Sequence, residues 1–182
     1  PFKGTEFGPV LTDGSMSAQV EAQFPWGKLK SEKTPIEGEE IEVNLASDKG
    51  FMDDMMTAVV NHTKEAAKAF ASGNVSGMTM AAPSYQNRLK EVTDGLKSSS
   101  TYYKGTYLST VFDLDSFRLY KEDGQWKTEL KGIEKHKSAY YDDYIAPKLE
   151  ENDSGYTYTL VYSEGKKKWL IEKSDPEAVI DI

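Results

Sequence analysis

The chain has 182 residues, a formal net charge of -8 and no cysteine. A length in this range suits one medium-sized domain or a small domain joined to another, and the lack of cysteine excludes disulfides, a thiolate nucleophile and thiolate-ligated zinc. The acidic charge balance makes nucleic acid an unfavourable partner, because phosphate backbones attract Lys and Arg.

The first 46 residues have the pattern of a small antiparallel β unit. Between Met16 and Phe24 apolar residues alternate with polar ones, which predicts a strand with one buried face. Residues 25–27 end this strand, residues 28–31 are extended, and a second alternation follows over residues 41–45. We therefore expect residues 1–46 to form a small or partial β domain, followed by a hinge.

The stretch from Phe51 to Phe70 predicts a long amphipathic helix, on which we expect the rest of the chain to close. Ser47 or Asp48 can cap its start, and Gly73 lies where such a helix would stop. The apolar face of this helix should be buried against a sheet, which places its methionines in the core. Its apolar residues have helical spacing: Met52, Met55, Met56, Val59, Val60, Ala66, Ala67 and Phe70.

A second helix and a run of strands follow. Ser84 can cap the second helix, whose apolar residues recur at spacings of four, three and four: Tyr85, Leu89, Val92 and Leu96. From residue 101 the period changes to two. This alternation predicts strands over residues 107–112, 117–121, 125–138, 156–162 and 168–172.

The sequence also predicts the connections between these strands. Asp123-Gly124 and Glu164-Gly165 predict hairpin turns, Gly132 marks an expected β-bulge, and residues 140–153 read as a long loop. Helices followed by a meander of long, bent strands are typical of an α+β fold. We expect a strongly curved antiparallel sheet that wraps the first helix and forms a cone.

This order of elements resembles the NTF2-like α+β cone. Three stretches are similar to the extracytoplasmic C-terminal region of the TcaA/YvbJ-type membrane-anchored proteins of Gram-positive bacteria. They are the strand and turn MSAQVEAQFPWGKLK at 16–30, the entry helix at 47–70 and the closing hairpin YTYTLVYSEGKKKWLIEK at 156–173. The resemblance implies an NTF2-like domain over residues 47–182. The NTF2-like domain at the start of some class B penicillin-binding proteins is the nearest alternative.

The resemblance also implies a location and a setting. Members of that family carry an amino-terminal zinc ribbon and a single membrane span, and they are linked to the cell envelope and to the response to glycopeptide antibiotics. This chain begins with Pro1 rather than Met and has no apolar run of about 18 residues, the length that a membrane span needs. We therefore expect an extracytoplasmic fragment, not itself embedded in the membrane, whose parent is anchored through a segment outside this sequence.

No motif in the sequence identifies a reaction. His62 is expected on a solvated helix face and His136 on a surface strand, because neither has the convergent partners of a metal site. Asp113 and Asp115 could serve as acid or base inside a pocket, but the favoured interpretation is that they mark a turn. We expect no enzyme, no catalytic residue, no metal and no cofactor.

The tyrosines are the candidate binding residues. The chain has 11 of them, and each offers a flat apolar face with a polar tip. Tyr140, Tyr141 and Tyr144 fall in the expected loop at the rim of the cone, and Tyr103 is a further candidate for contact with a ligand or partner.

These observations favour a non-enzymatic binding or scaffold module. It would present the mouth of the cone or a sheet face to a cell-wall component, a glycopeptide or a protein partner, and a homodimer through the open sheet is expected by analogy of fold. The alternative is an NTF2-like enzyme or carrier of small ligands, and a third interpretation is a structural spacer. A filled interior would favour the first hypothesis, and a pocket with convergent polar groups the second.

Overall fold

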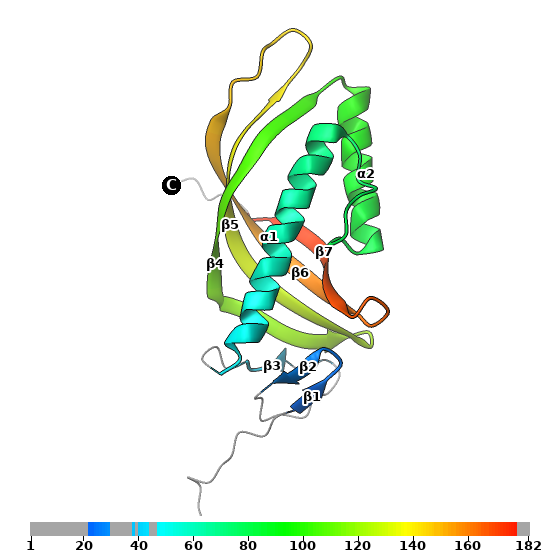
Figure 1. The fold of residues 1–182 in the computed structure, drawn as a ribbon, viewed down its shortest axis with the longest axis vertical. Coiled ribbons are helices and arrows are strands. Elements are labelled where there is room, and N and C mark those ends of the chain that lie inside the picture. The colour runs from blue at the N-terminus through cyan, green and yellow to red at the C-terminus, as the bar shows by residue number, and fades with distance from the viewer. Residues whose placement is uncertain (1–21, 30–37, 39, 44–46, 178–182) are drawn as a thin grey trace, which may run out of the picture.

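The structure is a computed structural model that describes residues 22–29, 38, 40–43 and 47–177. Within these residues two helices pack in the hollow of a five-stranded antiparallel sheet, and a two-stranded hairpin lies beside the base of this cone (Figure 1). This arrangement confirms the predicted α+β fold. In chain order the elements are β1 (Ala22–Phe24), β2 (Gly27–Leu29), β3 (Glu40–Ile41), α1 (Lys49–Ser72), α2 (Pro83–Ser98), β4 (Tyr102–Glu122), β5 (Gln125–Tyr141), β6 (Glu150–Ser163) and β7 (Lys168–Pro176).

Helix α1 crosses the concave face of the sheet, with Asp48 at its N-cap position and Gly73 at its end, but no side-chain hydrogen bond within the described residues caps its start. The carbonyl oxygen of Asp48 accepts a hydrogen bond from the backbone N–H of Met52 at 3.2 Å. At the other end Gly73 has a φ of 71°, and its N–H donates to the carbonyl oxygen of Ala69 at 2.7 Å. Glycine adopts this left-handed conformation at little cost, which explains why the helix stops there. Met52 and Met55 are buried as predicted, whereas Met56 is half-buried.

Helix α2 differs from the prediction at its start and on one face. It begins at Pro83 with Ala82 as the N-cap, so the expected cap at Ser84 is wrong. Proline suits the first helical turn because its missing N–H would have no partner there in any case. Tyr85 and Leu89 are buried as expected, but Val92 is exposed at the rim of a cavity.

Strand β4 is one continuous strand of 21 residues, where the sequence predicts two shorter strands. Its register against β5 shifts between Asp113 and Arg118. There the Asp113 carboxylate accepts a hydrogen bond from the N–H of Asp115 at 3.2 Å. The Ser116 hydroxyl donates to the carbonyl oxygen of Asp113 at 2.6 Å and accepts from the N–H of Lys131 at 2.9 Å. These local bonds hold an irregularity that bends the strand rather than a turn that ends it.

Gly132 on β5 has a different role from the bulge that the sequence suggests. Its register is unbroken on both sides, with Phe112 on β4 and Tyr156 on β6, so the expected bulge is wrong. A Cβ at Gly132 would lie 3.1 Å from Cγ2 of Thr110 and 3.1 Å from Cε2 of Tyr158. The missing side chain therefore makes room on the inner face of the sheet for neighbouring side chains.

The N-terminal elements connect to the cone in two ways. Strand β3 pairs with β4, with Ile41 opposite Leu119, and so extends the main sheet. Strands β1 and β2 form a separate hairpin around a turn at Pro25 and Trp26. Most of the strand expected over residues 16–24 lies outside the described residues. The domain boundary at residue 46 stays a prediction.

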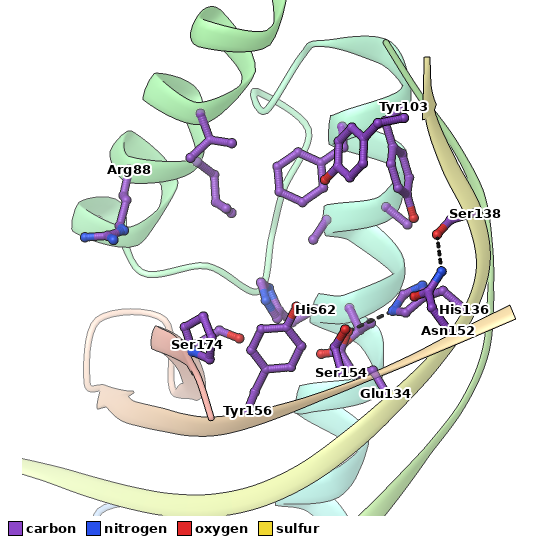
Figure 2. Close-up of a pocket in the computed structure, with 18 of the residues that line it drawn as sticks. His62, Arg88, Tyr103, Glu134, His136, Ser138, Asn152, Ser154, Tyr156 and Ser174 are labelled. Atoms are coloured by element: carbon purple, nitrogen blue, oxygen red, sulfur yellow. Dashed lines mark hydrogen bonds and ion pairs between the residues drawn. The ribbon is translucent and has the colours of Figure 1, made fainter. Parts of the chain in front are cut away.

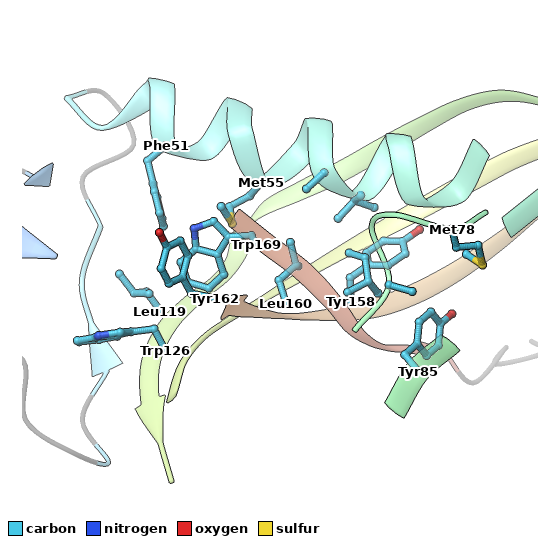
Figure 3. Packing of buried hydrophobic residues seen from close by; sticks show 14 of the residues in the cluster. Phe51, Met55, Met78, Tyr85, Leu119, Trp126, Tyr158, Leu160, Tyr162 and Trp169 are labelled. Atoms are coloured by element: carbon cyan, nitrogen blue, oxygen red, sulfur yellow. The ribbon is translucent and has the colours of Figure 1, made fainter. Parts of the chain in front are cut away.

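A cluster of aromatic rings fills the base of the cone (Figure 3). The Trp26 ring lies 4.9 Å from that of Trp169, 5.5 Å from that of Trp126 and 5.6 Å from that of Tyr162, measured between centroids. Phe51, in the first turn of α1, lies 5.7 Å from Trp26. Burial of such rings contributes much of the stability of a core, so this cluster ties the hairpin to the cone.

The N-terminal half of α1 therefore covers a packed core, and its C-terminal half covers the cavity described below. In the part of the chain that the structure describes, no helix has the length and apolarity needed to cross a bilayer.

Candidate functional site

A cavity of about 390 Å³ opens between the C-terminal half of α1, helix α2 and the inner face of the sheet (Figure 2). Aromatic rings form much of its wall, and hydroxyl and amide groups lie between them. We call the side formed by the sheet its floor. The aromatic wall consists of Phe70, Tyr85, Tyr103, Tyr140 and Tyr156, and the polar groups include Ser138, Asn152, Ser154 and Ser174.

The period of strand β5 builds the floor. Trp126, Thr128 and Leu130 point to the core, and the same alternation continues through Gly132 to the residues that line the cavity. Because side chains on a strand alternate between its two faces, every second residue after Gly132 points into the cone. These residues are Glu134, His136, Ser138 and Tyr140. One strand thus supplies apolar side chains to the base and polar side chains to the mouth.

Glu134 is a buried carboxylate at the centre of the floor, with 7% of its surface exposed. Its Oε2 accepts a hydrogen bond from the hydroxyl of Tyr158 at 2.5 Å and lies 3.3 Å from the hydroxyl of Thr63, which also bonds the carbonyl oxygen of Val59 at 3.0 Å. Its Oε1 lies 2.8 Å from Nε2 of His136. Burying a carboxylate costs free energy unless hydrogen bonds or a counter-charge replace water, and these groups supply the hydrogen bonds.

His62 is buried, so the expectation of a solvated helix-face histidine is wrong. Only 3% of its surface is exposed, and its Nε2 lies 3.5 Å from the hydroxyl of Tyr85. Burial lowers the pKa of His62 to about 4, because the charged imidazolium loses its hydration. The ring is therefore neutral at pH 7. Its Nδ1 has no hydrogen-bond partner among the described residues.

His136 also faces inward, which corrects the expected surface position. Its ring packs edge-on against Tyr107 at 5.6 Å between centroids, and its Nε2 faces Glu134. With a proton on Nε2, Nδ1 is a hydrogen-bond acceptor. This Nδ1 is buried and has no partner within the described part of the chain.

The tyrosines of the wall are neutral hydrogen-bonding groups. Burial raises the pKa of Tyr85 to about 12. Burial likewise raises the pKa values of Tyr103, Tyr140 and Tyr156, because phenolate is poorly solvated in the cone. The wall therefore offers flat rings and phenol hydroxyls, and it offers no phenolate at pH 7.

The structure brings together two of the four tyrosines that the sequence singles out. The rings of Tyr103 and Tyr140 lie 5.2 Å apart, and both line the cavity. Tyr140 is 60% exposed and forms part of the rim. Tyr141 is its neighbour on the opposite face of β5, next to Tyr102, and Tyr144 is 93% exposed in the connection after β5.

The expected loop over residues 140–153 is also shorter than predicted. Strand β5 continues to Tyr141 and β6 begins at Glu150, so Tyr140 and Tyr141 are strand residues rather than loop residues. The acid–base candidates Asp113 and Asp115 are exposed at the irregularity in β4 and do not line the cavity. Among the described residues, no group of three or more His, Asp or Glu side chains is placed to hold a metal ion.

Sequence reasoning missed the inner residues of the floor, although the signal was present. Continuing the alternation of Leu130 by two residues at a time leads to Glu134 and His136. Helical spacing likewise places His62 three residues after Val59 and four before Ala66, on the buried stripe of α1. What converges is a buried carboxylate, two imidazoles, several phenols and small hydroxyl groups, which suits hydrogen bonding and ring stacking.

Comparisons with known proteins agree with this fold. The family model of the YvbJ NTF2-like domain matches residues 55–175, and that of the TcaA protein 3rd/4th domain matches residues 2–45. The membrane protein YvbJ of Bacillus subtilis (strain 168) is 41% identical over 176 residues, which cover 96% of this chain and 29% of that protein. The chain thus spans less than a third of the length of this relative.

One solved structure shows the same fold at low sequence identity. The intermembrane space region of the chloroplast protein ARC6 has a TM-score of 0.55 and 14% identity to this chain. The likeness covers 68% of this chain and 93% of that one. At this identity it speaks for the fold alone.

Proposed function

The chain belongs to the YvbJ NTF2-like family, and from this premise we propose that its cone is a non-enzymatic binding module of a membrane-anchored envelope protein. The proposed location is the extracytoplasmic side of the membrane. The proposed ligand is a cell-wall component, a glycopeptide or a segment of an envelope protein. The relative named above is a membrane protein, which supports a membrane-anchored parent.

The observation that carries the proposal is the open cavity at the mouth of the cone. Its volume of about 390 Å³ fits a small ligand or the end of a larger one. Tyr103, Tyr140 and Tyr156 offer flat faces for stacking, and Ser138 and Asn152, which bond each other at 2.9 Å, lie beside them. Aromatic faces next to neutral polar groups are suited to sugars and peptides.

In this proposal the polar groups of the cavity bind a ligand and do not transfer protons. Both oxygens of Glu134 are engaged by side chains of the protein. A general base needs a pKa near the working pH. The pKa of His62, at about 4, is far below neutrality, and the pKa of Tyr85, at about 12, is far above it.

The same cavity also favours one part of the alternative hypothesis. A filled interior was expected to favour the binding or scaffold module, and a pocket with convergent polar groups the carrier or enzyme. The upper half of the cone holds such a pocket. A carrier of small ligands is therefore the second candidate. The two candidates share the cavity and differ in whether the ligand is free or is the end of a wall polymer.

Titration with soluble peptidoglycan fragments tests the proposal. We expect Tyr140→Ala to weaken binding at least about tenfold, as the loss of a central aromatic contact does. Tyr144→Ala is the matched control, because this tyrosine is 93% exposed and lies outside the cavity. Wild-type protein that binds no wall fragment, or two variants that behave alike, would overturn the proposal.

Homodimerisation through the outer face of the sheet stays a prediction. Val111 and Ile133 are directly paired across β4 and β5, and both side chains are exposed there. A second copy could cover this pair. Sedimentation of the wild-type protein beside Val111→Lys tests it: a monomeric wild type would contradict the prediction.

A further inference from the structure

The carboxyl group of Glu134 on the floor of the cavity indicates which chemical group the ligand carries. The geometry points to a ligand that carries an alkylammonium group, seated between Glu134 and the tyrosine rings of the wall. This inference rests on the proposed function, because it takes the cavity as the binding site. It goes further by naming the chemical group that is recognised and the residue that recognises it.

The first argument is that Glu134 is a buried carboxyl group without a fixed counter-charge. Among the described residues its only ionic partner is His136, which is cationic only when it binds a proton. His62 is neutral, since burial holds its pKa at about 4. A buried charge is costly unless an opposite charge compensates it, so the floor favours a cation.

On the outer face of the same sheet, a buried charged group is paired with opposite charges of the protein itself. Lys127 is nearly buried on β5, and its ammonium group lies 3.1 Å from a carboxylate oxygen of Glu122 and 3.0 Å from one of Glu172. That charged cluster is complete within the protein. At Glu134 the corresponding ammonium group is missing from the described residues, and an open cavity lies where a ligand could supply it.

The second argument comes from the rings of the wall. Tyr103 and Tyr140 lie 5.2 Å apart with their planes tilted by 56°, and Phe70 packs edge-on against Tyr103 at 6.0 Å. The faces of such rings carry partial negative charge and attract ammonium groups. Tyr156, in the same wall, has its ring 6.0 Å from that of Tyr158, whose hydroxyl bonds Glu134, so an aromatic ring lies near the carboxyl group. A carboxylate near aromatic rings selects a cation over a neutral group of the same shape.

The third argument is that hydrogen-bond acceptors remain open. An ammonium group has three N–H donors. Oε1 of Glu134 has one partner among the described residues and can accept a second hydrogen bond, and Nδ1 of His136 is a buried acceptor when the proton is on Nε2. The hydroxyls of the wall tyrosines can accept as well. The donors of the ligand and the open acceptors of the cavity are therefore complementary.

Arg88 restricts where in the cavity the ammonium group of the ligand can bind, a position that we call its seat. It lines the cavity from α2, and Figure 2 shows it on the side opposite Glu134. A guanidinium group repels an ammonium group, so the seat lies at the floor and away from α2. Removing the charge of Arg88 should leave amine binding unchanged or strengthen it, whereas removing the charge of Glu134 should weaken it.

The test compares two probes that differ in one charge. Nα-acetyl-lysine methylamide carries the ammonium group, and its Nε-acetyl derivative is neutral. We expect the wild-type protein to bind the amine at least about tenfold more tightly, as charge-assisted contacts do. Glu134→Gln should remove this preference, and Arg88→Gln should keep it. Glu91→Gln, on the exposed face of α2, is the control for loss of one negative charge and should keep it too.

A second pair of variants covers the case in which Glu134→Gln does not fold. Tyr140 is largely exposed, so Tyr140→Leu should fold and bind the amine several-fold more weakly, and Tyr140→Phe should retain most of the affinity. Equal binding of the two probes, no binding of the amine at millimolar concentration, or an amine preference that survives in folded Glu134→Gln would overturn the inference. If wall fragments still bind and depend on Tyr140, the proposed function stands without it.

Discussion

The hydroxyl of Tyr158 donates a hydrogen bond of 2.5 Å to Oε2 of Glu134, although the two residues are not opposite each other in the sheet. Tyr158 on β6 is paired with Leu130 on β5, four residues before Glu134. Its ring reaches the carboxylate by passing beside Gly132, where a side chain would crowd it. The contact joins the packed core at the base of the cone to the polar floor of the cavity.

Tyr158→Phe should destabilise the protein by about 2 kcal/mol, because Oε2 of Glu134 then keeps only Thr63 as a partner. Urea denaturation followed by circular dichroism measures this. Tyr120→Phe is the matched control: its hydroxyl bonds the less buried Glu129 at 2.9 Å, so its loss should cost less than about 1 kcal/mol. Equal effects of the two variants would contradict the special role of the buried pair.

Gly132→Ala should destabilise the protein by about 1–3 kcal/mol, because the added methyl group would crowd Tyr158 and Thr110. Gly95→Ala provides a control of opposite sign. Gly95 lies inside α2 with open space around it, so alanine there should stabilise the helix by about 0.5–1 kcal/mol. A stabilising effect at both positions would show that Tyr158 does not need the space beside Gly132.

The stability should depend on pH through His62. Its pKa is lowered from 6.5 to about 4 in the folded protein, so the unfolded chain binds more protons between these values. The part of the free energy of unfolding that is linked to His62 is therefore fully present above pH 6.5 and is lost as the pH falls towards 4. It amounts to about 3 kcal/mol. Titration of the His62 ring by NMR gives the pKa directly, and a value near 6.5 would contradict the buried, neutral ring.

Much of the fold could be predicted because its signals are local. The apolar stripe and the stop at Gly73 define α1, and Asp123-Gly124 defines the tight turn between β4 and β5. The continuity of β4 could not be predicted in the same way. Asp113 and Ser116 are turn-forming residues in sequence, and only their bonds to each other and to Lys131 show that the strand runs on.

Two of the candidate binding residues lie in the cavity, and their role in binding stays a prediction. Tyr103 and Tyr140 stand out as aromatic residues, and both line the cavity. His62 and His136 were expected at the surface because polar side chains are mostly exposed, and Glu134 was not among the candidates. They are buried because α1 packs over the inner face of the sheet where these side chains lie. This tertiary relationship is not contained in any local sequence pattern.

Trp26→Ala should destabilise the protein by about 3 kcal/mol, because the ring is packed against Phe51, Trp126 and Trp169. Trp26→Phe should restore most of the loss, since an aromatic ring would remain in the cluster. Thermal unfolding of the three proteins measures the difference. An unchanged melting temperature in Trp26→Ala would mean that the hairpin of β1 and β2 contributes nothing to the stability of the cone.

The claim on which the account depends is that ligands enter the cavity at the mouth of the cone, and chemical-shift mapping by NMR tests it most directly. The isotope-labelled protein would be titrated with soluble peptidoglycan fragments. We predict that the perturbed resonances belong to residues that line the cavity, with Tyr103, Ser138 and Tyr140 among the largest shifts. Shifts that gather instead on the outer face of the sheet around Val111 and Ile133, or no shifts at all, would contradict the account.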